Sequence, residues 1–198
     1  MGYSILNNGQ PRNQRNQRDY YPTPRAFCDA ALALVEITPQ RILDVGVGRG
    51  VWGAAARSRW SAAHIEGVEA RDVTPHPAYD VWHRGDYLHH PLSGEFDLIM
   101  GNPPYNIAES AVRRSLGLRG AGGEVLFLLR LAFLESQSRY RGLWEEHPPS
   151  RVIVSASRIS FTGDGKSDAT AYALYGWQGH TRSSTSAGVC LWWFDWKA

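Results

Sequence analysis

Two adjacent prolines stand between an asparagine and a tyrosine in the stretch GNPPYNIAES. This stretch follows the apolar run FDLIM, residues 96–100, which predicts a buried strand. Proline has no backbone donor and fixes its own φ, so Pro103 and Pro104 end the sheet pairing and stiffen the chain after it. We therefore expect a rigid turn, from Asn102 to Tyr105, at the end of a buried strand.

The residue types of this turn suit the chemistry of an amino group attached to a base. An exocyclic amine is a poor nucleophile because its lone pair is delocalised into the ring. The side-chain oxygen of Asn102 and the carbonyl of Pro103 are two acceptors that could take the two amino protons. Tyr105 offers a flat face on which a base could stack once it has left a duplex. The turn therefore predicts catalysis mainly by positioning.

A second candidate site is the stretch LDVGVGRG, which places Asp44, Gly46, Gly48 and Gly50 at a strand-to-helix turn. Glycines allow a tight turn and let backbone amides approach a ligand, while the start of the helix offers unpaired donors. Asp44 could accept a hydrogen bond from a cationic or hydroxylated ligand. The next strand ends at Glu69, about 20 residues further on, where an acid can hold both hydroxyls of a ribose. These features predict a ligand that carries a nucleoside.

The spacing Gly-x-Gly-x-Gly after an aspartate resembles the loop of class I methyltransferases that bind S-adenosylmethionine. The resemblance implies S-adenosylmethionine as the cofactor, with its amino-acid half over the glycines and its ribose on Glu69. It also implies that Asp86, in HRGDYL, faces the adenine amino group with Tyr87 beside it. The alternative for Asp86 is an ordinary loop aspartate that caps a turn.

Together with NPPY, the chain from about residue 20 to residue 177 resembles the amino-methyltransferases that modify adenine N6 in DNA. The stretches YPTPRAF, DVGVGRG and NPPY stand in the order of the subgroup in which cofactor motifs precede the catalytic motif. The resemblance implies that Asn102, Pro103, Pro104 and Tyr105 form the catalytic turn. The compact chain is most similar to small phage and prophage enzymes of this family.

The same resemblance assigns binding roles on either side of these motifs. Tyr21, Thr23, Pro24 and Phe27 would cover the methionine end of the cofactor, although YPTP could also be a stiff lead into the first helix. Phe161, in SRISFTGDGKSD, falls where family members carry a loop that approaches the flipped base. It is a candidate stacking partner, and a plain mobile loop is the alternative.

Arginines gather before the first helix in a segment that holds one acid. Arg12, Arg15 and Arg18 could follow a phosphate backbone, because arginine pairs with phosphate through two donors. A solvated flexible tail is the alternative. We expect residues 1–19 to form a flexible basic arm that helps to bind DNA.

Residues 20–198 are expected to form one catalytic domain, since 198 residues of which 43% are hydrophobic suit a single core. Only 21 residues follow Trp177, so we expect no separate target-recognition domain. Target specificity and oligomeric state therefore stay open.

The elements that must position these residues alternate between strands and helices, which predicts an α/β protein. The pattern predicts a mostly parallel sheet with helices on both faces and an antiparallel edge. The resemblance implies that this is the Rossmann-like class I methyltransferase fold, with a seven-stranded sheet. Helices are predicted over 25–37, 49–60 and 107–118, and a further helix continues from the fifth strand to residue 147.

Composition limits the compartment and the other partners. The chain lacks a run of about 18 apolar residues and begins with a polar segment, which predicts a cytoplasmic protein of a bacterium or phage-infected cell with no membrane partner. His89 and His90 are adjacent and therefore diverge, so we expect no metal.

Three alternatives to DNA remain open at this level. RNA adenine poses the same electronic problem as DNA adenine, and so does the amide nitrogen of a protein glutamine. The turn cannot distinguish these targets, although the early YPTP and the arginine arm favour nucleic acid. A different class is a degenerate module that binds nucleic acid without turnover.

Overall fold

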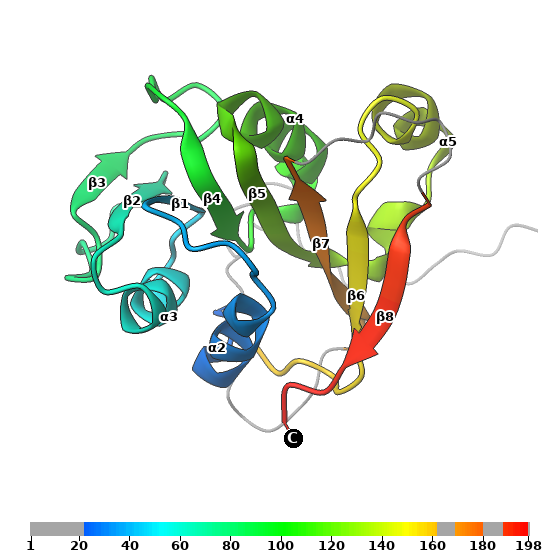
Figure 1. Ribbon diagram of the computed structural model, residues 1–198, viewed down its shortest axis with the longest axis horizontal. Coiled ribbons are helices and arrows are strands. Elements are labelled where there is room, and N and C mark those ends of the chain that lie inside the picture. The colour runs from blue at the N-terminus through cyan, green and yellow to red at the C-terminus, as the bar shows by residue number, and fades with distance from the viewer. Residues whose placement is uncertain (1–21, 162–168, 180–187, 198) are drawn as a thin grey trace, which may run out of the picture.

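The computed structural model describes residues 22–161, 169–179 and 188–197. These residues form one mixed sheet with helices on both faces (Figure 1). The strands, in their order across the sheet, are β3 (Val81–Arg84), β2 (His64–Glu69), β1 (Arg41–Val45), β4 (Phe96–Gly101), β5 (Arg119–Arg130), β7 (Tyr172–Gln178), β6 (Arg151–Ser155) and β8 (Cys190–Phe194). The basic arm predicted for residues 1–19 lies outside the described residues.

The sheet is mostly parallel, as the sequence predicts. Strands β3, β2, β1, β4 and β5 pair in parallel, and β7 pairs antiparallel with both β5 and β6. The sheet has eight strands rather than seven, because β8 adds to β6 in parallel. The chain runs outward from β1 through β2 to β3 and then returns to β4, so the strand order reverses between β1 and β4. Ligands of open α/β sheets bind at such a reversal, beyond the carboxyl ends of the strands.

Helices cover the two faces of the sheet in pairs (Figure 1). One face carries α2 (Arg25–Ala33) and α3 (Val51–Arg59), and the other carries α4 (Ala108–Leu118) and the short α5 (Gln137–Arg139). Residues of β5 alternate between the two cores: Leu126 belongs to the core under α2, and Phe127 to the core under α4. The strand therefore reads as a continuous apolar run because it is buried on both sides.

The prediction of a long helix after the fifth strand is wrong. The chain instead forms a short 3-10 turn, η2 (Leu131–Leu134), then α5, then a π-helical turn, η3 (Tyr140–Trp144). Ser136 interrupts the segment with a φ of 116°, and its side chain accepts a hydrogen bond from the Arg139 amide. The apolar residues had the spacing of a helix, but a local cap and a positive φ break it.

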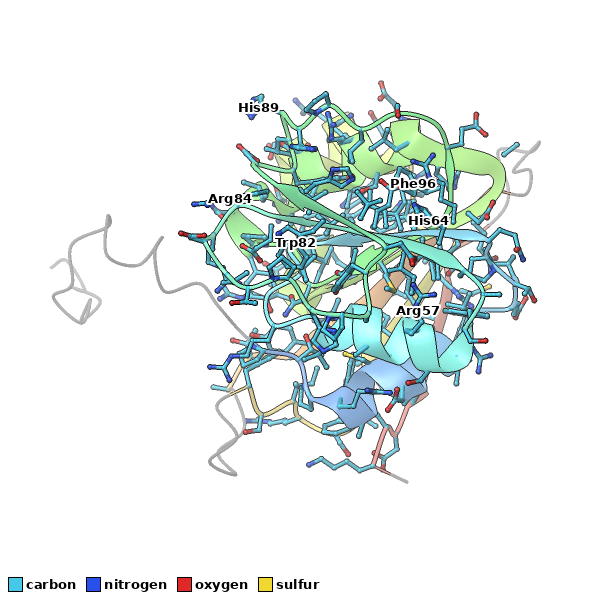
Figure 2. The ribbon with its side chains drawn as sticks, turned by 90° about the vertical axis from the view of Figure 1, so that its left-hand side faces the viewer. Arg57, His64, Trp82, Arg84, His89 and Phe96 are labelled. Carbon is cyan, nitrogen blue, oxygen red and sulfur yellow. The ribbon has the colours of Figure 1, made fainter. Side chains whose placement is uncertain are left out.

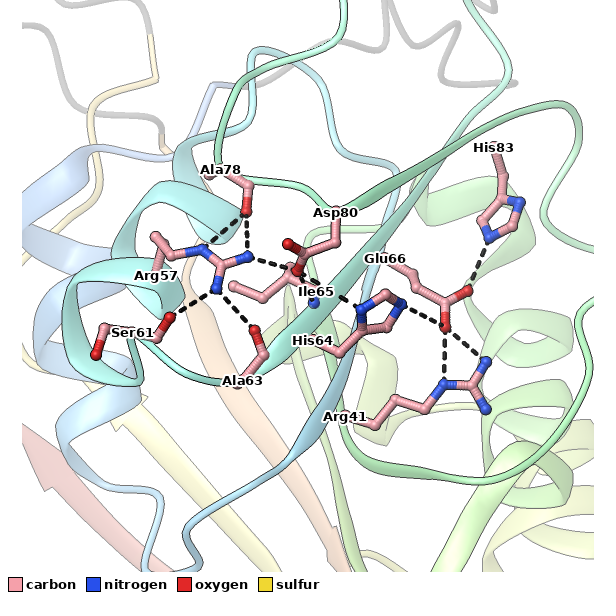
Figure 3. Close-up of polar contacts among 10 residues, drawn as sticks. All are labelled: Arg41, Arg57, Ser61, Ala63, His64, Ile65, Glu66, Ala78, Asp80 and His83. Atoms are coloured by element: carbon pink, nitrogen blue, oxygen red, sulfur yellow. Dashed lines mark hydrogen bonds and ion pairs between the residues drawn. The ribbon is translucent and has the colours of Figure 1, made fainter.

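A polar network fastens the β1–β2–β3 side of the sheet (Figure 3). The buried carboxylate of Glu66 accepts from Arg41 Nε at 2.7 Å and lies 2.8 Å from His83 Nε2. Asp80 accepts from Arg57 at 2.5 Å. Burial raises the pKa of Glu66, but hydrogen bonds from His83 and Arg41 outweigh it, so the net shift is downward. The carboxylate thus stays charged and links three strands.

Within the described ranges, no helix is long and apolar enough to cross a membrane.

Candidate functional site

The glycine loop adopts the conformation that its residues predict. Gly46, Gly48 and Gly50 have φ angles of +73°, +63° and +80°, which fall in the left-handed region that favours glycine. Gly50 is also the N-cap of α3. A Cβ on Gly50 would lie 2.5 Å from Cβ of His76, so this position lacks space for any side chain. The loop therefore turns tightly from β1 into α3.

The Asn102–Tyr105 turn packs directly on this loop. A Cβ on Gly46 would lie 3.6 Å from both Pro103 Cα and Pro104 Cδ, which is ordinary van der Waals contact. The last residue of β4, Gly101, has a φ of +145° and leaves no room for a Cβ, which would lie 2.5 Å from the carbonyl oxygen of Val45. The two prolines and this glycine together fix the turn against the loop.

Loop and turn line one cavity of about 510 Å³, part of it open to solvent. Its walls include Thr23, Gly46, Gly48, Glu69, Asn102 and Pro104. The structure thus brings together six of the residues that the sequence singled out. Pro22, Arg49, Trp52 and Arg71 also line this cavity, and sequence reasoning missed them.

The amide of Asn102 is oriented by a contact from the chain segment before α2. Its Nδ2 donates to Thr23 Oγ1 at 3.4 Å, and the same hydroxyl accepts from Trp52 Nε1 at 3.3 Å. Thr23 itself is buried. Because Thr23 engages the amide nitrogen, the oxygen is the end of Asn102 that can accept from a ligand.

Glu69 points at the glycine loop from the end of β2. Its Oε2 accepts from Gly48 N at 2.8 Å, and Arg71 donates through Nε to Oε1 at 2.9 Å and through Nη2 to Oε2 at 3.0 Å. Burial raises the pKa of Glu69, but the bonds from Arg71 and Gly48 outweigh it and lower the pKa below its ordinary value. The carboxylate is therefore ionised at neutral pH. Its two oxygens already accept four hydrogen bonds, from Gly48 and from the backbone and side chain of Arg71, so Arg71 has to release bonds before ligand hydroxyls can take their place.

Asp44 lies beneath the loop rather than in the wall of the cavity. It is fully buried, and Tyr79 donates its hydroxyl to Oδ2 at 2.6 Å. Oδ1 has no hydrogen-bond partner among the described residues. Burial raises the pKa of Asp44 to about 7. Tyr79, ten residues past Glu69 in an irregular segment, carried no signal that predicted this contact.

Two residues predicted around the methionine end of the cofactor have other positions. Phe27 is fully buried in the core, with its ring 5.5 Å from that of Phe194 and 5.7 Å from that of Trp196. Its helical position, two residues after the start of α2, turns it towards the sheet. Pro24 is the N-cap of α2 and does not line the cavity. Tyr21 lies outside the described residues.

Asp86 and Tyr87 do not reach the cavity either. The Asp86 side chain is 55% exposed and accepts from the Leu88 amide at 2.9 Å, so it caps its own turn, which is the alternative that the sequence left open. Tyr87 is buried under α4, where its hydroxyl lies 2.7 Å from Ser115 Oγ. Next to them, His89 lies on the surface (Figure 2).

Tyr105 stands between aromatic and cationic neighbours. The guanidinium carbon of Arg130 lies 4.5 Å from the centroid of its ring, and the ring of Tyr172 lies 5.9 Å away. Phe161 is buried and contacts Tyr172 edge-on at 5.0 Å. Burial raises the pKa of the Tyr105 hydroxyl far above its ordinary value, and Tyr172 adds to the shift. Arg130 thus covers one face of the ring on which a base was predicted to stack, and Phe161 contacts Tyr172, which neighbours Tyr105.

A second cavity, of about 440 Å³, opens on the other side of Tyr105. Its lining includes Tyr105, Ala108, Arg130, Phe133 and Arg139. Asn102 and Pro104 line the first cavity while Tyr105 lines the second, so one rigid turn contributes to the walls of both. The predicted DNA-binding residues Arg12, Arg15 and Arg18 lie outside the described residues.

No protein-family model and no curated protein matches this sequence. Solved structures do match it. A Listeria monocytogenes protein described as a class I S-adenosylmethionine-dependent methyltransferase has a TM-score of 0.69 at 15% identity, over 92% of this chain and 68% of that chain. A Pyrococcus horikoshii protein described as an RNA methyltransferase has a TM-score of 0.54 at 15% identity, over 81% of this chain and 82% of that chain. Human methyltransferase-like protein 13, solved in complex with SAH, has a TM-score of 0.50 at 18% identity, over 82% of each chain. At these identities the likeness establishes the fold: the chain has the Rossmann-like fold of class I methyltransferases.

Proposed function

We propose that this protein transfers a methyl group from S-adenosylmethionine to the exocyclic N6 amine of adenine in DNA. The observation that carries the proposal is the contact between the Asn102–Tyr105 turn and the glycine loop, with Asn102 and Gly46 in the wall of one cavity. A donor bound over the loop would then lie next to the amide that receives the amine.

The residues of the first cavity fit S-adenosylmethionine. The ionised Glu69 would accept from the ribose hydroxyls while it stays bonded to Gly48, with the Arg71 side chain giving up its bonds to the carboxylate. The amides of the loop and of the start of α3 can approach the amino-acid end, and Thr23 borders the same space. The unpartnered Oδ1 of Asp44 leaves an acceptor directly below the loop. The SAH bound to one structural neighbour is the demethylated form of this cofactor, which supports the assignment.

When bound, S-adenosylmethionine supplies a methyl group on a positively charged sulfur. The protein has to hold the amine in line with it. Asn102 Oδ1 and the Pro103 carbonyl would accept from the two amine hydrogens, which draws the nitrogen lone pair out of the ring. The nitrogen gains the methyl group and loses one proton to solvent, so no side chain has to act as a strong base. Most of the acceleration would come from this orientation.

The target base would stack on Tyr105, and Arg130 would have to leave the ring face for it to do so. Tyr172 lies 5.9 Å from the Tyr105 ring at a tilted angle, and Phe161 packs edge-on against Tyr172. A base is favoured over a glutamine side chain because an aromatic face with a cation on it suits a planar ring.

RNA adenine is the second candidate, and the Pyrococcus neighbour described as an RNA methyltransferase favours it. A glutamine amide of a protein and a degenerate binding module remain as the alternatives that the turn itself cannot exclude.

The test is methyl transfer from tritiated S-adenosylmethionine to matched DNA, RNA and glutamine-containing peptides, followed by digestion and identification of the labelled product. We expect label in N6-methyl-2′-deoxyadenosine released from DNA. Label only in the RNA would make RNA adenine the target instead of DNA adenine. Label on cytosine or glutamine would overturn the adenine assignment. Tight SAH binding without transfer to any substrate would favour the binding module.

A further inference from the structure

We propose that the second cavity, beyond Tyr105, binds a backbone phosphate of the strand that carries the target base. This inference rests on the proposed function and gives it a recognition site for the nucleic acid. The cavity lies on the far side of the catalytic turn from the glycine loop. Its described lining consists of Tyr105, Ala108, Leu129, Arg130, Ala132, Phe133 and Arg139.

The charge of the cavity favours an anion. Arg130 and Arg139 line it, and no acidic side chain is among the described residues of its wall. Each guanidinium lies over an aromatic ring, Arg130 at 4.5 Å from the Tyr105 centroid and Arg139 at 4.9 Å from the Phe133 centroid. Stacking holds the plane of the Arg139 guanidinium, and its Nη1 and the second N–H of Nη2 are the donors that its backbone bonds leave for phosphate oxygens.

Arg139 is held in place before any ligand arrives. Its Nε donates to the carbonyl of Phe133 at 2.9 Å, and its Nη2 donates to the carbonyl of Glu135 at 2.5 Å. The turn around Ser136, with its positive φ, presents both carbonyls to the same side chain. A phosphate that binds here pays little of the ordering entropy that a free arginine would cost.

The position of the cavity links it to the target base. Tyr105 is in the wall of the cavity and only three residues from Asn102, and a base is joined to its phosphate through a single sugar. A base at Asn102 therefore brings a phosphate close to the second cavity. When the base displaces Arg130 from Tyr105, that phosphate gives the guanidinium a new partner.

The test compares Arg139→Ala with Arg59→Ala. Arg59 is a matched control, because its guanidinium also stacks on an aromatic ring, 5.2 Å from the centroid of Trp60, but it lies at the last residue of α3 and lines neither cavity of the site. Binding of a fluorescent, adenine-containing DNA duplex is measured in the presence of SAH over a range of salt concentrations. We expect Arg139→Ala to bind about tenfold more weakly and to lower the slope of log K against log salt by about 1, and Arg59→Ala to match the wild type.

Two further experiments test whether Arg139 contacts the phosphate beside the target adenine. A duplex with an uncharged methylphosphonate at the phosphate beside the target adenine should bind the wild type and Arg139→Ala equally. Arg139→Lys keeps the charge and should keep the salt slope while it loses part of the affinity, which separates loss of contact from loss of folding. An unchanged slope in Arg139→Ala, or a difference that survives on the methylphosphonate duplex, overturns the inference. Methyl transfer measured on the same duplex decides the proposed function separately, since binding with SAH needs no turnover.

Discussion

The two cavities on either side of the Asn102–Tyr105 turn share a wall but balance their charges in different ways. On the glycine side, Arg71 is paired with the ionised Glu69, and Arg49 also lines the cavity. On the Tyr105 side, Arg130 and Arg139 are stacked on rings, and no carboxylate is in the described lining. The first arrangement offers a carboxylate for the hydroxyls of a nucleoside, and the second suits an anion. The turn can therefore separate donor from target while it touches both.

The largest effect should come from the turn itself. Asn102→Ala removes an acceptor needed only by the target amine, so the transfer rate should fall about 1000-fold while SAH affinity changes less than about twofold. Single-turnover rates and calorimetric titration measure the two quantities. The exposed neighbour Asn106 supplies the control, since Asn106→Ala should leave both unchanged. A normal transfer rate in Asn102→Ala would remove the role proposed for the turn.

Asp44, the acid below the glycine loop, should make the free energy of unfolding depend on pH. The pKa of Asp44 rises from 3.8 unfolded to about 7 folded, so the folded protein keeps a proton that the unfolded chain has lost. Stability from this group therefore falls as pH rises from about 4 to about 7 and is level above that. Between pH 5 and pH 8, the free energy of unfolding of Asp44→Asn should gain on the order of 3 kcal/mol relative to wild type. Urea unfolding at both pH values checks this, and parallel pH profiles for the two proteins would contradict it.

The conformational constraint on the glycine loop can be tested by comparing an alanine substitution at Gly50 with one at Gly117, a glycine that has free space around it. Gly50→Ala forces a side chain into a positive φ and against His76, so we expect a loss of about 2 kcal/mol in the free energy of unfolding. Gly117 lies in α4, where an added Cβ would have no neighbour within 4 Å among the described residues, and Gly117→Ala should be neutral or gain up to about 1 kcal/mol. Equal stabilities for the two variants would show that the loop is not constrained in this way.

The smallest expected effect distinguishes the two strand-end acids. Glu69→Gln keeps the shape but loses the charge that would hold the ribose hydroxyls, so SAH should bind about tenfold more weakly, which is about 1.4 kcal/mol. Asp86 caps its own turn outside the cavity, and Asp86→Asn should leave SAH affinity unchanged. Calorimetric titration of both variants measures the difference, and a larger loss in Asp86→Asn would reverse the assignment.

The comparison of the two cavities also marks what the sequence could predict. The first cavity depends on residues with strong local rules: glycines that need a positive φ, prolines that end a strand, and an acid at a strand end. Parallel strands then bring these residues to one edge of the sheet. That is why Gly46, Glu69 and Asn102 meet as predicted, and why the mostly parallel sheet with helices on both faces was predictable.

The second cavity depends on contacts that have no local signature. Arg130 and Arg139 meet Tyr105 and Phe133 because the segment after β5 breaks at Ser136 instead of continuing as a helix. Helical spacing of apolar residues could not predict that break. Asp86 shows a related limit, since an acid at a strand end can face the ligand or cap its own turn, and only the following loop decides.

The most direct measurement of the central claim is a crystal structure of the protein with SAH and a short adenine-containing DNA. The account predicts the ribose on Glu69, the sulfur of SAH beside Asn102, and the N6 amine of an extruded adenine within hydrogen-bond distance of Asn102 Oδ1. An empty glycine-side cavity, or SAH bound there with Asn102 turned away from both sulfur and base, would contradict it.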